Sequence, residues 1–191
     1  KPPIVFMACS SGGEKAARYL ITEPPDHQRI KQAASGPWGT PLNCATDSKY
    51  SLDLFRFLLD EGFDPNAKDE NGKTVLHNHR NVDVIGLLVS RGANVNAIDN
   101  EGMTPLHCAA EKNFLESARL LLEAGADFRI ESNNGAMPLA YAVAYAFGHQ
   151  EEGRLDVAKL LISHGAKKED KNSKGRSLLD IDLYKEVLSA I

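Results

Sequence analysis

The chain has 191 residues, of which 42% are apolar and 25% are charged. This apolar content excludes a disordered chain, and the formal charge of −4 argues against a nucleic-acid partner. No apolar run approaches the roughly 18–20 residues of a membrane-spanning helix, so we expect no membrane insertion. The sequence opens on a lysine without a signal peptide. We therefore expect a fragment of a longer protein.

Residues 1–38 predict an irregular first unit. Pro3–Gly13 and Ala16–Ile21 indicate a degenerate pair of short helices, followed by a linker. Trp38 is the only tryptophan of the chain and stands two residues before Thr40. Tryptophan is over-represented among interface residues that carry large binding energies. Two interpretations of Trp38 stay open: it anchors a partner at a turn tip, or it folds back over the irregular first unit.

The helix start at Thr40 and Pro41 recurs along the chain. A threonine hydroxyl can accept a hydrogen bond from an unsatisfied first-turn N–H group. A proline at the first helical position has no N–H group to leave unpaired. The same start stands at Thr104 and Pro105, and Thr74 begins a further copy without the proline. These residues predict where the first helix of each unit begins.

Residues 99–131 form the most complete unit. Its first helix has Leu106 followed by small apolar residues, which let a neighbouring helix pair approach closely. The segment Leu115–Leu122 has apolar residues at helical spacing and predicts an amphipathic second helix. Gly125 stands where this helix should stop and suits a left-handed C-cap conformation. The unit therefore predicts two helices followed by an outstretched turn.

The connecting turn has a constant length, while the helix pairs vary. From the last apolar residue of a second helix to the next threonine equivalent is 15 residues, as from Val89 to Thr104. The helix pair spans 16 residues in 99–131, 13 in the unit before it and 23 in the unit after it. Residues 69–98 are therefore three residues short, and residues 132–169 carry seven extra. We expect the short unit to be the least stable.

The Thr-Pro-Leu-His sequence at 104–107, with its Ala-Ala step, terminal glycine and period of about 33 residues, resembles the ankyrin-repeat family. The resemblance implies an all-α fold, an ankyrin-repeat α-solenoid of about five repeats with degenerate capping units at both ends. We expect residues 1–191 to form a single ankyrin-repeat domain. Its predicted units are residues 1–38 (irregular helix pair and linker), 39–68 (repeat two), 69–98 (short repeat three), 99–131 (repeat four), 132–169 (repeat five with an inserted loop) and 170–191 (C-terminal cap).

The three cysteines show no Cys-x-x-Cys spacing. Cys44 and Cys108 stand at equivalent places in their units, and Cys9 lies on the same kind of helix. Equivalent positions in neighbouring units hold the thiols apart, so we expect small buried thiols rather than disulfides. This predicts a reducing compartment, the cytoplasm, with the nucleus as an open alternative.

Neither a metal site nor catalysis is expected. His77 and His79 have the spacing of a ligand pair, but no Cys, Asp or Glu constellation accompanies them. The resemblance gives His77 and His107 a structural role, hydrogen-bonding toward neighbouring turns. The sequence has no Gly-rich phosphate loop, no Gly-x-Ser-x-Gly elbow and no His-Glu-x-x-His. We therefore predict that the chain is not an enzyme and takes no cofactor.

The resemblance implies that partners bind at the turn tips and the exposed side of the first helices. The positions carried over, together with Trp38, are Glu70, Asn71, Lys73, Asn100, Glu101, Met103, Glu111, Lys112, Asn133, Asn134 and Tyr145. Trp38, Met103 and Tyr145 are the expected apolar anchors. Tyr141 and Tyr145 lie one helical turn apart, and they either widen a groove-facing patch or pack against the inserted loop. For any single tip residue, the alternative is a merely solvated side chain.

We predict a monomeric, non-catalytic module that binds a protein or peptide partner. One alternative is a regulatory or targeting segment of a larger enzyme, such as a pathogen effector or a signalling protein. Another is an inhibitor that occludes a partner enzyme. The resemblance also implies that Asn96, and less readily Asn66, stands at a turn position that ankyrin proteins often offer to an asparaginyl hydroxylase.

Overall fold

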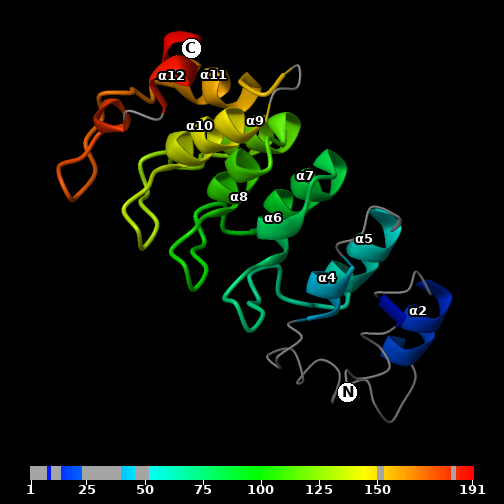
Figure 1. Ribbon diagram of the computed structural model, residues 1–191. Helices are drawn as coiled ribbons and strands as arrows, with labels where there is room; N and C mark the ends of the chain where they lie inside the picture. Colours follow the sequence, from blue (N-terminus) through cyan, green and yellow to red (C-terminus); the bar gives the residue numbers. More distant parts are fainter. Residues whose placement is uncertain (1–7, 10–13, 23–39, 46–51, 150–152, 182–183) are drawn as a thin grey trace. The chain divides into compact units, whose positions relative to one another are not determined.

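The computed structural model describes residues 8–9, 14–22, 40–45, 52–149, 153–181 and 184–191 (Figure 1). Every regular element within these residues is a helix, which confirms the predicted all-α class. The chain divides into two compact units, Lys1–Asp99 and Asn100–Ile191, which are described in turn.

The first unit contains α2 (Glu14–Thr22), α4 (Pro41–Cys44), α5 (Leu52–Asp60), α6 (Val75–Asn78) and α7 (Val82–Ser90). Helix α5 packs against α4 and α7. Its Phe55 and Leu58 are fully buried, as are Ile85 and Leu88 of α7. Helix α2 is linked to α5 by Arg18, whose guanidinium lies 4.5 Å from the centre of the Phe57 ring. The second helices α5 and α7 therefore supply large, fully buried side chains to the core of this unit.

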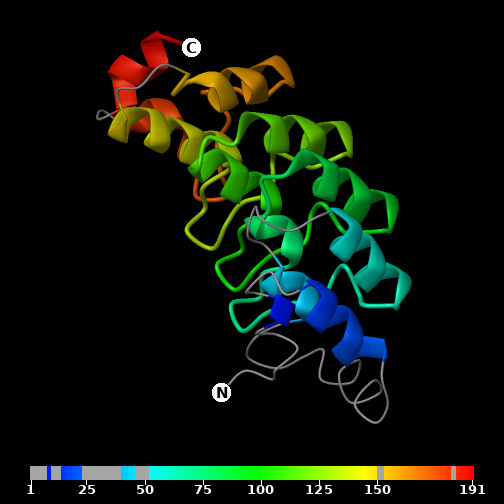
Figure 2. The same cartoon turned by 90° about the vertical axis from the view of Figure 1, so that its right-hand side faces the viewer.

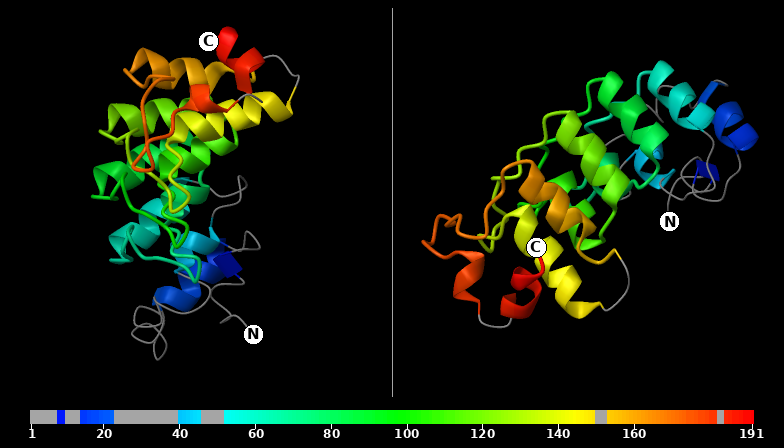
Figure 3. Two further views of the ribbon diagram at one scale, coloured as in Figure 1. Left: turned by 60° about the vertical axis from the view of Figure 1, so that its left-hand side comes forward. Right: turned by 90° about the horizontal axis from the view of Figure 1, so that it is seen from above.

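The second unit contains α8 (Pro105–Glu111), α9 (Leu115–Glu123), α10 (Pro138–Gly148), α11 (Asp156–Ser163), the 3₁₀ helix η1 (Leu178–Asp180) and α12 (Lys185–Ser189). The first helices α8 and α10 pack side by side, and α9 packs on α11 behind them (Figure 2). The buried residues Leu106, Leu121, Val143 and Leu161 come from all four helices. This gives two helical layers with the connecting turns at one end (Figure 3).

The helix boundaries follow from the capping residues. Thr40 and Thr104 are extended N-cap residues whose hydroxyls accept first-turn N–H groups, and Pro41 and Pro105 follow them. At the other end, Gly125 has φ +88° directly after α9, as predicted. An L-residue with a side chain adopts this conformation only under strain, so the glycine ends the helix at low cost.

The differences in length of repeats three and five can be assigned to particular helices. Helix α6 has four residues where α8 has seven, while the second helices α7 and α9 both have nine. The missing three residues of repeat three therefore come from the end of its first helix. In repeat five, α10 has 11 residues. A large part of the extra length thus extends this helix, and the rest lies in the connection to α11.

Candidate partner-binding surface

A buried histidine ties the start of α8 to the next turn. The Thr104 N–H group donates to Nδ1 of His107 at 3.0 Å. The proton of the neutral ring is therefore on Nε2, which donates to the carbonyl oxygen of Ala136 at 3.1 Å. The ring is 0% exposed. His107 thus has the structural role that the family resemblance implied, and it is not available to a partner.

Asn43 makes the same connection at the start of α4. Its Oδ1 accepts the Thr40 N–H group at 3.1 Å, and its Nδ2 donates to the carbonyl oxygen of Lys73 at 3.1 Å. The carboxamide of Asn43 thus makes the two hydrogen bonds that the ring nitrogens of His107 make in repeat four. Sequence reasoning missed this role, although the signal was present: Asn43 follows Thr40 by three residues, as His107 follows Thr104.

The tip residues of repeat three differ in how freely they reach solvent. Glu70 and Asn71 are exposed. Lys73 is half-buried, and its Nζ lies 3.9 Å from Oδ2 of Asp99, a carboxylate whose side chain is 0% exposed. A buried carboxylate requires a compensating charge. Lys73 therefore contributes to the structure of this unit and is a less suitable contact residue than its two neighbours.

Hydrogen bonds join the turn at the start of repeat five to the turn at the start of repeat four. Asn133 is exposed, and its backbone N–H group and Nδ2 donate to the carbonyl oxygens of Glu101 (2.8 Å) and Asn100 (2.9 Å). This close approach requires a glycine at 102, since a Cβ atom there would lie 2.6 Å from Oδ1 of Asn133. Asn134 is exposed and donates from Nδ2 to the Tyr141 hydroxyl at 3.2 Å. The exposed edges of these tips are polar.

Of the three predicted apolar anchors, one is buried and another lies outside the described residues. Met103 is only 3% exposed, so the prediction of an exposed anchor at this position is wrong. Its position just before the cap Thr104 places it in the packed base of the turn rather than at the tip. Trp38 lies outside the described residues.

The two tyrosines of α10 have separate roles. The Tyr141 hydroxyl donates to Oγ of Ser132 at 3.3 Å, and its ring meets His107 edge-on with 5.4 Å between centroids. Tyr145 is half-buried and stacks on His149, with centroids 4.0 Å apart and planes at 13°. Tyr141 therefore stabilises the turn, whereas Tyr145 packs against His149 and stays partly exposed.

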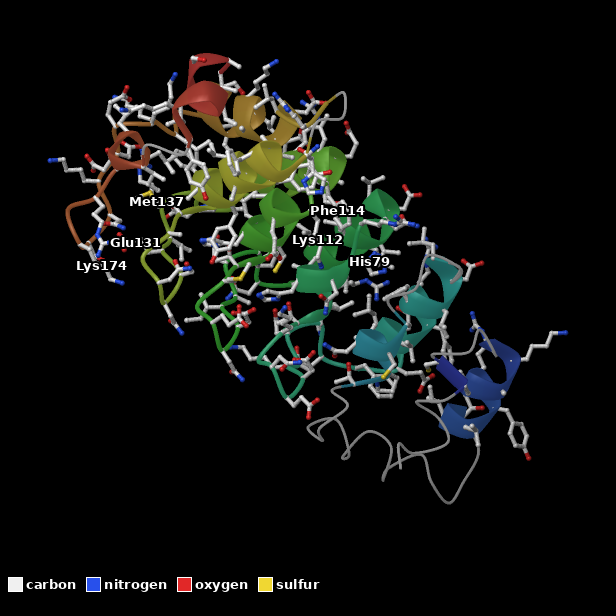
Figure 4. The ribbon with its side chains drawn as sticks, in the orientation of Figure 1. His79, Lys112, Phe114, Glu131, Met137 and Lys174 are labelled. Atoms are coloured by element: carbon white, nitrogen blue, oxygen red, sulfur yellow. The ribbon has the colours of Figure 1, made fainter. Side chains whose placement is uncertain are left out.

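The end of α8 presents two charged residues. Glu111 and Lys112 are both exposed, directly after the buried Ala109 and Ala110. Lys112 is the C-cap residue of α8 (Figure 4), where a positive charge interacts favourably with the helix dipole. This pair is the most accessible part of the predicted surface on a first helix.

Burial favours the neutral form of two thiols and one imidazole in the first unit. Burial raises the pKa of the Cys9 thiol to about 12, with a smaller contribution from Cys44, and burial also raises the pKa of Cys44. Burial lowers the pKa of His79 to about 4. Its Nε2 has no hydrogen-bond partner among the described residues. Nor do those residues contain a group of three or more His, Cys, Asp or Glu placed to hold a metal ion.

Repeated units of two helices and a turn define a helical repeat protein, and in repeats two and four a polar residue bridges the start of the first helix to the next turn. The family model for ankyrin repeats (3 copies) matches residues 42–132 and 78–172, and the chain belongs to the ankyrin-repeat family. The comparison with curated proteins finds no match. Ankyrin repeats are in general protein–protein interaction modules. None of the helices in the described part of the chain has the length and apolar character to span a bilayer.

Proposed function

We propose that the chain is a non-catalytic module that binds a protein or peptide through its turn tips and the exposed ends of its first helices. The observation that carries this proposal is a difference in character between the buried and the exposed residues of the repeats. Apolar side chains of the second helices, such as Leu58, Leu88 and Leu121, are buried, as is the bridging His107, and the bridging Asn43 is half-buried. The exposed positions are polar and differ from turn to turn, and they are Glu70, Asn71, Asn100, Glu101, Glu111, Lys112, Asn133 and Asn134.

The proposed surface divides binding between polar and aromatic contacts. Exposed charges such as Glu101 and Lys112 mainly set specificity and the association rate. Large side chains in fitted contacts contribute most of the affinity. Tyr145 is the described candidate for such a contact, and Trp38 stays a candidate from the sequence. We further propose that the protein acts as a monomer in a reducing compartment, since Cys9, Cys44 and Cys108 are free thiols.

Alanine substitutions on two faces test this proposal once affinity capture has supplied a partner. Tyr145→Ala, Glu111→Ala and Lys112→Ala change the proposed surface. Arg119→Ala and Lys159→Ala are matched controls, since both residues are exposed on second helices. We expect Tyr145→Ala to weaken the dissociation constant about tenfold or more, the two charge variants to weaken it less, and the controls to leave it unchanged by titration calorimetry.

Circular dichroism of each variant verifies that the helices are intact. The proposed surface is wrong if the second-helix variants weaken binding while the three surface variants bind like the wild type.

A further inference from the structure

The second unit contains a cavity of about 290 Å³ between the start of α10 and the two turns that flank it. Its apolar wall includes Phe128, Met137, Leu139 and Leu178. Met137 lies at the start of α10, close to the turns that carry Glu131 and Lys174 (Figure 4). Small-molecule pockets commonly measure about 300–1,000 Å³. This cavity therefore suits a single ring or side chain rather than a large cofactor.

The cavity has a specific origin in the repeat pattern. The position three residues after the cap holds Asn43 in repeat two and His107 in repeat four, and each donates to a carbonyl oxygen of the next turn. In repeat five the equivalent residue is Ala140, three residues after the cap Met137, and both line the cavity. A methyl group thus occupies the place where the other units have a ring or a carboxamide.

The acceptor that such a ring would use is also present. Arg176 precedes the cap Ser177 as Ala136 precedes Met137, and both Arg176 and Ser177 line the cavity. Among the described residues, the carbonyl oxygen of Arg176 accepts a hydrogen bond from the Asn172 N–H group alone, at 2.9 Å. The carbonyl oxygen of Ala136 accepts the equivalent bond from Ser132 at 3.0 Å and, in addition, the His107 Nε2–H group. A carbonyl has two lone pairs, so the oxygen of Arg176 has room for a further donor.

The charges on the cavity wall favour a neutral ligand. The wall contains the cationic residues Lys167 and Arg176 and the acidic residues Asp170 and Asp180, so the formal charges balance. The apolar side chains around them favour a flat ring over a hydrated ion.

We propose that this cavity binds a neutral, planar nitrogen heterocycle with an N–H donor, of which imidazole is the smallest. The ring occupies the place of the missing histidine side chain and donates to the carbonyl oxygen of Arg176, as His107 does to Ala136. This site adjoins the proposed partner-binding surface at Asn134, which lines the cavity, but ligand binding here does not require a protein partner.

A titration of the full chain with imidazole, followed by amide NMR at a pH of about 8.5, tests the site. Imidazole is mostly neutral at this pH. We expect saturable shifts at Ala140, Arg176 and Ser177, with a dissociation constant on the order of millimolar for so small a ligand. 1-Methylimidazole has no N–H group, so it should bind about fivefold to tenfold more weakly. N-acetylhistidine methylamide distinguishes the sources: binding at the same amides indicates a peptide-borne ring, and its exclusion indicates a free small molecule.

Two substitutions on α10 control the assignment. Ala140→His fills the cavity with the protein's own ring and should weaken imidazole binding at least tenfold. Ala144→His adds the same side chain one turn later, at an exposed position that does not line the cavity, and should leave binding unchanged. The proposal is overturned if the wild type shows no saturable shifts, if Ala140→His binds imidazole like the wild type, or if 1-methylimidazole binds as tightly as imidazole. This last comparison needs no variant, so it decides the matter even where Ala140→His does not fold.

Discussion

Repeats three and four begin alike and diverge after one helical turn. Both start with a threonine cap whose N–H group donates to Nδ1 of the histidine three residues later, at 3.1 Å from Thr74 to His77 and at 3.0 Å from Thr104 to His107. Helix α8 then continues for seven residues, whereas α6 ends after four. The comparison shows that the cap and the second helix define a repeat, while the end of the first helix can be lost.

The lost turn changes what is buried. The last turn of helix α8 packs Ala109 and Ala110 in the interior. After α6 the chain instead buries the ring of His79, which is 5% exposed and meets Phe55 edge-on with 5.0 Å between centroids. An imidazole thus occupies a place where repeat four has only methyl groups. The short repeat is completed by a polar ring that must stay neutral.

The largest loss of stability is expected when repeat four loses the bridging side chain of His107. His107→Ala removes the acceptor for the Thr104 N–H group, removes one of the donors to the Ala136 carbonyl oxygen and opens a cavity. We expect a loss of about 3 kcal/mol in the free energy of unfolding, measured by denaturant titration. Tyr141→Phe keeps the ring beside His107 and removes only a hydroxyl, so it should cost about 1 kcal/mol or less. An equal loss in both variants would contradict the bridging role.

Acid should weaken the short repeat through His79. Its pKa is about 4 in the folded protein and 6.5 in the unfolded chain, so protonation favours unfolding. The stabilisation is complete above pH 6.5 and declines as the pH falls toward 4, by on the order of 3 kcal/mol. Denaturant titrations at pH 7 and pH 4.5 measure this decline.

His79→Gln is the matched control, because it replaces the titrating ring with a neutral polar side chain while all carboxylates remain. The variant should lose less stability between the two pH values than the wild type. The same pH dependence in both proteins would mean that His79 does not titrate in this range.

Amide exchange should separate the two repeats without any substitution. Helix α6 has a single turn and is followed by the extended C-cap residue His79, so few helical hydrogen bonds protect it. We expect the amides between residues 74 and 84 to exchange about tenfold faster than those between residues 104 and 122, which corresponds to about 1.4 kcal/mol in local stability. Equal or slower exchange in the short repeat would show that its length does not determine its stability.

The sequence predicted those features that adjacent residues determine. Thr104, Pro105 and Gly125 act within their own helices, so helix starts and stops could be derived without a structure. The exposure of a tip residue depends instead on how its turn packs, and Met103 was therefore placed wrongly. Tyr141 could not be assigned either, since its partners Ser132 and Asn134 meet it only after the turn has folded.

The smallest effect on stability is expected in repeat two, where the carboxamide of Asn43 makes the two hydrogen bonds that an imidazole makes in repeat four. In Asn43→His the Nδ1 atom can accept the Thr40 N–H group and Nε2–H can donate to the Lys73 carbonyl, so the bonds of His107 are reproduced. We expect Asn43→His to change the free energy of unfolding by about 0.5 kcal/mol or less. Asn43→Ala lacks both groups and should cost about 1–2 kcal/mol. Thermal and denaturant unfolding of the two variants measure the difference. If Asn43→His is as damaging as Asn43→Ala, the two side chains are not equivalent, and the bridge depends on the size of the residue rather than on its hydrogen bonds.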